Sequence, residues 1–150
     1  MNLLAIETSA PVGSIAVQCA GKVSEASIAT PREQTSRVLP LIDELLSAAG
    51  ISLQALDGIA FGRGPGSFTG IRVATAVAQG LGLAAATPLL PVSCLAATAQ
   101  RAWREFAGKA SLVSLDARMG EVFWCGFTMQ SGLPSALGIE RLSSPRAVRW

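Results

Sequence analysis

The chain contains no histidine and no tyrosine among its 150 residues. Histidine supplies the base in most serine and cysteine hydrolase triads and most ligands in zinc hydrolase sites, so either site would need an unusual substitute here. Charged residues are also few, at 15% of the chain, and the formal net charge is +2 with both signs interspersed. This pattern forms no stripe for a polyanion, so any contact of this chain alone with nucleic acid is expected to be weak.

Long apolar runs and paired cysteines are missing as well. The longest apolar segment, residues 74–90, is interrupted by polar residues and a proline, so no run reaches the length of a membrane span. No basic region precedes the apolar residues at the N-terminus, and we therefore expect no signal peptide. Cys19, Cys94 and Cys125 are odd in number and far apart, which favours reduced thiols in the cytoplasm over a disulfide framework or a zinc site.

What is present in quantity is hydrophobic sequence, at 50% of the residues, which is enough for a full core. Apolar alternation predicts strands 3–7, 13–20 and 22–29 as an antiparallel meander. The elements expected after it are a helix from Thr35 or Ser36 to Ala49, a strand 59–61, a helix 71–84, a strand 89–92 and a helix from Ser93 to Phe106. Pro40 is expected near the first turn of the first helix. The second helix is apolar on nearly every side, which indicates either a core helix or one whose small residues admit a partner helix.

The segment 61–70, FGRGPGSFTG, carries four glycines and one proline, which predicts a tight turn lying against something else. It precedes a helical pattern, and the N–H groups at the start of a helix favour anions. The known phosphate-binding spacings fail, because Gly-Lys-Ser/Thr is missing and Thr69 stands where a dinucleotide motif needs glycine. A structural turn and a ligand or partner contact both stay open, with Arg63 and Ser67 as candidate contact residues. Ser67 as a nucleophile has neither the Gly-x-Ser-x-Gly elbow nor a histidine.

Two polar groups follow apolar strand patterns. Glu7, Thr8 and Ser9 could hold Mg²⁺ with the carboxylate and phosphate with the hydroxyls. The alternative is a polar turn whose side chains bond their own backbone. The second group, at residues 116–121, combines two carboxylates with an arginine and fits either a small charged site or an ion-paired hairpin.

An internal repeat relates the two ends of the chain. Residues 4–9 and 13–17 are echoed by residues 113–118 and 120–124, each copy having an apolar strand that ends in a carboxylate, a turn and a second strand. Two copies of a meander predict two domains of one fold. We expect residues 1–108 to form the first domain and residues 109–150 to form the opening strands of a truncated second domain.

Four motifs in chain order resemble the TsaB family, also called YeaZ, a bacterial subunit of the machinery that places threonylcarbamoyl on adenosine 37 of tRNAs. They are residues 6–9 (IETS), 32–40 (REQTSRVLP), 62–72 (GRGPGSFTGIR) and 116–124 (DARMGEVFW). The resemblance implies an α/β fold of the actin-like ATPase (RNase H-like) type, with a mixed sheet, helices and two related domains. Members of the family have a complete second domain.

The resemblance also implies a non-catalytic scaffold or activator with no catalytic residue or metal, and with no cofactor except ATP or ADP at the boundary of the complex. The implied partners are the catalytic subunit TsaD, the ATPase TsaE through the complex, and tRNA only through the complex. Cytoplasmic localisation without membrane contact is expected as well. The apolar surface of the helices that would meet TsaD can self-associate when TsaD is absent, so we expect a homodimer of the isolated chain. Two alternatives stay open: an ATP-using enzyme of this fold, with Glu7–Ser9 at the phosphates, and a glycoprotease-like peptidase, against which the lack of histidine argues.

Pairing with TsaD is implied through the helices of the first domain. The implied interface residues are Val38, Leu39, Ile42, Leu45, Leu46, Arg72, Ala74, Thr75, Ala78, Gln79 and Gly82. One departure from the family is Gln34, which stands where relatives often have histidine, so the role of that histidine is not carried over.

Overall fold

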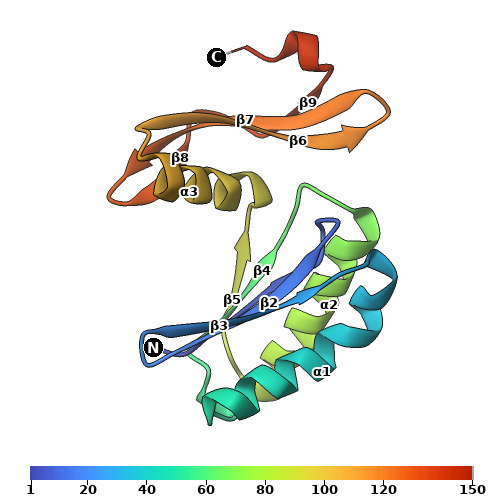
Figure 1. Cartoon of the computed structure of the whole chain (residues 1–150), viewed down its shortest axis with the longest axis vertical. Helices are drawn as coiled ribbons and strands as arrows, with labels where there is room; N and C mark the ends of the chain where they lie inside the picture. The colour runs from blue at the N-terminus through green and yellow to red at the C-terminus, as the bar shows by residue number, and fades with distance from the viewer. Residues whose placement is uncertain (150) are drawn as a thin grey trace. The chain divides into compact units, whose positions relative to one another are not determined.

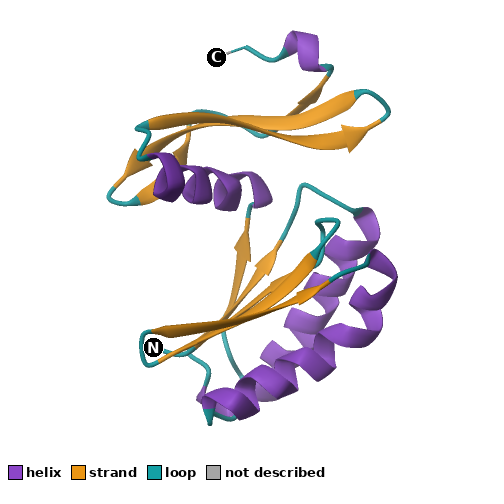
Figure 2. Cartoon of the chain, in the orientation of Figure 1, coloured by secondary structure: helices purple, strands orange, loops and turns teal. Residues whose placement is uncertain are grey.

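The computed structural model describes residues 1–149 except the side chains of Pro31 and Gln34. The chain forms two compact units, one made of residues 1–63 and 67–92, the other of Gly64–Gly66 and the residues from Ser93 onward. Each unit is a sheet with helical cover, which Figure 1 labels and Figure 2 colours by element type. Trp150, where we expect the truncation, and the side chain of Gln34 lie outside the described residues.

The first unit is built on a mixed sheet of five strands in the order β3-β2-β1-β4-β5. The strands are β1 (Leu3–Glu7), β2 (Gly13–Cys19), β3 (Lys22–Ile28), β4 (Gly58–Gly62) and β5 (Leu89–Val92). The first three pair antiparallel, whereas β4 pairs parallel with both β1 and β5. Alternate residues of β1 and β2, such as Leu4 and Val17, are fully buried, because they point to the one face that the helices cover. The expected meander and the mixed α/β fold are confirmed.

Helix α1 (Pro31–Ala49) packs on β2 and β3, and α2 (Phe68–Ala85) packs on β4, β1 and β5. Both helices lie on the same face of the sheet (Figure 1). The expected start of the first helix at Thr35 or Ser36 is wrong, because the helix begins at Pro31, where proline is favoured at the first position. Pro40 therefore lies inside the helix rather than in its first turn. It is exposed, so water can reach the carbonyl of Ser36 that would otherwise accept its N–H.

Helix α2 packs on the sheet of the first unit along a stripe of small residues. Gly70, Ala74, Ala78 and Gly82 recur every fourth position, and all four are buried. A Cβ at Gly82 would lie 2.7 Å from the Leu89 side chain, so the helix approaches this part of the sheet as closely as glycine allows. By length and composition α2 could also cross a membrane, but the core helix of a globular unit passes the same test. Only 22% of its residues are buried, and its inner side packs on three strands, so α2 covers one face of the sheet rather than lying inside the core.

The second unit combines helix α3 with a four-stranded sheet. Its elements are α3 (Cys94–Phe106), β6 (Ala110–Arg118), β7 (Glu121–Gln130), β8 (Leu133–Ala136), β9 (Arg141–Ser143) and a 3₁₀ turn η2 (Pro145–Ala147). Leu95 and Ala99 of α3 share a core with Val113, Cys125 and Phe127 of the sheet. The expected cap at Ser93 is confirmed: its hydroxyl oxygen accepts the N–H of Ala96 at 3.2 Å, and the hydroxyl donates to the Glu140 carboxylate.

The repeat predicted from the sequence is visible in how the strands pair. β6 and β7 form an antiparallel hairpin, as β1 and β2 do. The third strand differs, because β3 runs unbroken along β2 whereas its counterpart is split into β8 and β9, both paired with β7. The N–H of Leu137 still donates to the carbonyl of Gly126 in β7 at 2.8 Å, and residues 138–140 then separate β8 from β9, so the second meander has an interrupted edge.

The two compact units divide between Val92 and Ser93, whereas we expect the domain boundary at residue 108. The reason is the packing of α3, which contacts β6, β7 and β8. The assignment of residues 1–108 and 109–150 to two domains stays a prediction, and α3 belongs by its contacts to the second unit.

Candidate functional site

The polar residues at the end of β1 are held by the first unit itself. Thr8 is fully buried, and its hydroxyl donates to the carbonyl of Gly70 at 2.6 Å. The backbone N–H of Ser9 donates to the Glu7 carboxylate, and the carbonyl of Ser9 accepts the N–H of Ser67 at 2.8 Å. These hydrogen bonds tie the turn to the start of α2. They match the structural alternative for Glu7–Ser9, a turn whose polar groups bond the backbone.

Two glycines make room for this turn. A Cβ at Gly62 would lie 1.8 Å from a carboxylate oxygen of Glu7, and a Cβ at Gly70 would lie 1.9 Å from the carbonyl oxygen of Thr8. Atoms of the chain therefore fill the space beside both glycines. The expectation that the glycine-rich segment lies tightly against something is met at these positions by residues 7–9.

The structure shows where the five candidate contact residues from the sequence lie: Glu7, Thr8, Ser9, Arg63 and Ser67. Glu7, Thr8, Ser9 and Ser67 come together, and Ser67 caps α2, its hydroxyl accepting the N–H of Gly70 at 3.3 Å. Arg63 has an exposed side chain, and its backbone N–H donates to the carbonyl of Val92 at 2.9 Å. No group of three or more Cys, Asp or Glu side chains within residues 1–149 could hold a metal ion.

The charged group at residues 116–121 forms the tip of the β6–β7 hairpin. The Asp116 carboxylate accepts the backbone N–H of Arg118 at 2.8 Å instead of pairing with its guanidinium. Arg118, Met119 and Gly120 all have positive φ, and Met119 is 99% exposed. This geometry is that of a tight hairpin turn. The hairpin is closed by the bond from the Arg118 backbone to Asp116 and not by an ion pair between their side chains.

The eleven implied interface residues separate into two groups. Six of them pack in the core of the first unit with exposures of 9% or less: Val38, Ile42, Leu45, Leu46, Ala74 and Ala78. Gly82 is also buried, against Leu89. These side chains face the chain's own sheet, and their assignment to an interface stays a prediction. Leu39, Arg72 and Gln79 are exposed, and Thr75 is half-buried.

Sequence reasoning missed two prominent side chains on the outer surface of α2. Phe68 is 72% exposed and Leu83 is 87% exposed. The Arg72 guanidinium lies 3.2 Å from the centre of the Phe68 ring and donates to the Phe68 carbonyl at 3.4 Å. Phe68 was missed because the helix was expected to begin at Ile71. We call Leu39, Phe68, Arg72, Gln79 and Leu83 the outer helix face.

Cys125 is expected to be the least reactive thiol of the chain. It is 2% exposed, and burial, with the nearby Glu140 charge as a second cause, raises the pKa of its thiol. Cys19 and Cys94 are half-buried. At about pH 8, near the ordinary thiol pKa, iodoacetamide should therefore modify Cys125 about tenfold more slowly than the other two, as peptide mass spectrometry can measure.

The same shift predicts a pH dependence of stability. A thiol with a raised pKa keeps its proton in the folded state, so its contribution to folding stability is complete below the unfolded pKa and is lost as pH rises through the folded pKa.

Equal labelling rates for the three thiols in folded protein would contradict the burial of Cys125.

Comparison with known proteins places this fold in a family. The family model described as TsaD, tRNA N6-adenosine threonylcarbamoyltransferase, matches residues 27–136. TsaB from Escherichia coli is 43% identical over 127 residues, which cover 85% of this chain and 55% of that protein. A solved structure of YeaZ from Pseudomonas aeruginosa superposes with a TM-score of 0.94 at 42% identity, over 99% of this chain and 70% of that chain.

The chain belongs to the TsaB/YeaZ family. TsaB from Haemophilus influenzae is also similar, at 42% identity over 124 residues, 83% of this chain and 52% of that protein. The chain thus spans about half the length of the TsaB relatives it matches. The resemblance seen in the motifs and the actin-like fold of the first sheet are confirmed. The match to the TsaD model shows that this chain is also similar to the transferase family, although the chain has no histidine.

Proposed function

We propose that this chain acts as the non-catalytic TsaB subunit in the synthesis of threonylcarbamoyladenosine at adenosine 37 of tRNAs. The observation that carries the proposal is the identity to TsaB from E. coli, whose name describes a tRNA threonylcarbamoyladenosine biosynthesis protein. The lack of histidine supports a role without hydrolytic or zinc chemistry. We place this subunit in the cytoplasm. TsaE and tRNA belong to the same complex, and neither requires direct contact with this chain.

The outer helix face is the surface that we propose for TsaD. Helices α1 and α2 have 19 and 18 residues and are about 27–29 Å long. Their buried sides pack on the sheet, and they leave Leu39, Phe68 and Leu83 exposed on the outer side. Large apolar side chains exposed along the outer side of two neighbouring helices are suited to contact with a partner. Two such helices from each partner are long enough to bury the roughly 1,200–2,000 Å² of a stable complex.

The relation between the two folds supports the same surface. Because the TsaD model matches residues 27–136, TsaD is expected to present a related pair of helices. Related subunits can then pack about a pseudo-twofold axis, as identical subunits do about a true one. The same argument gives a homodimer of this chain when TsaD is absent. The ATP-using alternative gains no support from residues 7–9, because their hydroxyl and amide groups bond one another and the start of α2.

The direct test mixes the purified chain with TsaD and measures the mass of the complex by sedimentation. We expect the homodimer to give way to a heterodimer as TsaD is added. A chain that stays monomeric alone at micromolar concentration, and stays so in the presence of TsaD, would overturn the proposed pairing. The matched TsaB from E. coli serves as the positive control.

A further inference from the structure

The second unit has a cavity of about 170 Å³ where α3 ends and β6 begins. Its lining residues come from α3, the following turn, β6 and β7: Ala102, Trp103, Phe106, Gly108, Ala110, Ser111 and Met129. The volume is below the roughly 300–1,000 Å³ typical of small-molecule sites. The cavity therefore suits a single planar group held at the surface better than an enclosed ligand.

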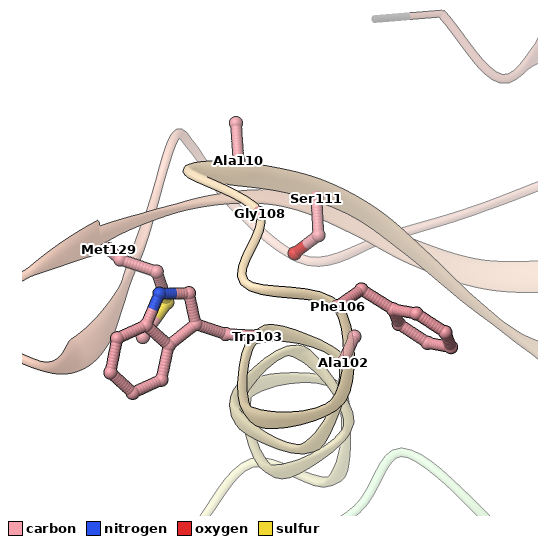
Figure 3. A pocket seen from close by; sticks show the side chains of 7 residues that line it. All are labelled: Ala102, Trp103, Phe106, Gly108, Ala110, Ser111 and Met129. Atoms are coloured by element: carbon pink, nitrogen blue, oxygen red, sulfur yellow. The ribbon is translucent and has the colours of Figure 1, made fainter.

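Two aromatic side chains, Trp103 and Phe106, supply the large apolar surfaces of the cavity. Trp103 and Phe106 are three residues apart on α3, so they lie on neighbouring positions of one side of the helix. Phe106 is 77% exposed, although removing a phenyl ring from water lowers the free energy. In Figure 3 the indole of Trp103 lies beside Met129 and the Phe106 ring lies on the opposite side, with the Ser111 hydroxyl between them.

This combination of groups has a specific chemical partner. Aromatic faces stack on unpaired nucleobases, and each such base contributes about 1–3 kcal/mol in alanine substitutions. The Ser111 hydroxyl and the Trp103 indole N–H supply polar groups that can hydrogen-bond the edge of a base. An aliphatic side chain would use neither the polar groups nor the stacking surface.

The charge of the second unit points the same way. Residues 93–149 carry seven basic against four acidic side chains, whereas the rest of the chain carries five basic against six acidic ones. Lys109 is exposed and stands between two lining residues, Gly108 and Ala110. A lysine at the rim of a base-binding cavity is placed to contact the phosphate of the same nucleotide.

We propose that this cavity binds one unpaired nucleotide of an RNA, with its base against Trp103 and Phe106 and its phosphate near Lys109. The inference rests on the proposed function in one respect, since that function supplies RNA rather than DNA as the polynucleotide. It goes beyond that function, in which tRNA needs no direct contact with this chain. The contact adds to the binding of tRNA by the complex, because a single stacked base and one phosphate give low affinity alone.

The test uses the whole chain and a fluorescently labelled RNA stem-loop whose loop is unpaired, with binding measured by anisotropy at low salt. Phe106→Ala should weaken binding about tenfold, which corresponds to the loss of one stacked base. Leu90→Ala is the control, because Leu90 is 62% exposed but lies in the first unit and outside the outer helix face. Lys109→Ala should lower the dependence of log K on log salt by about one. Circular dichroism confirms that each variant is folded.

Four outcomes would overturn the proposal: no measurable binding of the stem-loop, equal binding by Phe106→Ala, equal losses in Phe106→Ala and Leu90→Ala, or equal binding of a fully paired duplex. An equal effect in the two variants would indicate nonspecific contact through exposed apolar side chains. Sedimentation with TsaD contains no RNA, so the failure of this site and the failure of the proposed function are distinguishable.

Discussion

Replacing Leu83 by glutamate should abolish binding of this chain to TsaD while leaving the chain folded. Leu83 is 87% exposed on α2, so the substitution removes no core contact, and glutamate is a good helix former. In an interface, the new carboxylate would be buried opposite an apolar surface without a partner. Truncation or charge insertion at the centre of an interface commonly costs more than about 2 kcal/mol, which weakens binding at least roughly thirtyfold. Sedimentation or calorimetry with TsaD measures the change.

The matched control is Leu133→Glu. Leu133 is 66% exposed at the start of β8, so the same chemical change is made on the second unit, away from the outer helix face. We expect this variant to bind TsaD like the wild-type chain. If Leu83→Glu binds TsaD with unchanged affinity, or if Leu133→Glu loses as much, the outer helix face is not the interface.

Replacing Gly70 by alanine should produce the largest loss of stability among single small substitutions in the first unit. Its Cβ would lie 1.9 Å from the Thr8 carbonyl oxygen and 2.8 Å from Cα of Ser9. Backbone atoms cannot rotate away as a side chain can, so either the β1–β2 turn or the start of α2 must move. The buried hydrogen bond from Thr8 to Gly70 is then strained as well. We expect a loss of about 3 kcal/mol or more in the free energy of unfolding, measured by urea denaturation.

Gly80 provides a control in the same helix. A Cβ there would meet nothing within 4 Å, so Gly80→Ala removes only the conformational freedom of glycine. It should stabilise the chain by about 0.5–1 kcal/mol. Gly70→Ala with wild-type stability would show that Thr8 and α2 are less tightly packed than the structure has them.

The strands of the first meander could be anticipated from the sequence because apolar alternation marks them. Ile15 and Val17 alternate with Ser14 and Ala16, and the structure buries Ile15 and Val17. The hairpin of the second unit followed from its likeness to the first. The start of α1 could not be anticipated, because residues 32–37 are polar, and exposed where described, and so carry no apolar periodicity.

The site was harder to predict because periodicity does not say which neighbour covers an apolar face. Ala74 and Ala78 are small and suit a partner helix, yet both are fully buried against the chain's own sheet. Leu83, in contrast, is apolar but exposed. Glu7–Ser9 combined groups typical of a phosphate site, and only the contacts with Gly62 and Gly70 show that atoms of the chain occupy the space. Such contacts join residues about sixty positions apart, which no local pattern reports.

The most direct test of the account is reconstitution of tRNA modification. The reaction contains TsaD, TsaE, tRNA and threonylcarbamoyl-adenylate, with or without the protein that carries this chain, and threonylcarbamoyladenosine is measured by mass spectrometry. The account predicts that modification requires the protein and is lost with Leu83→Glu. Equal modification without it would contradict the proposed role.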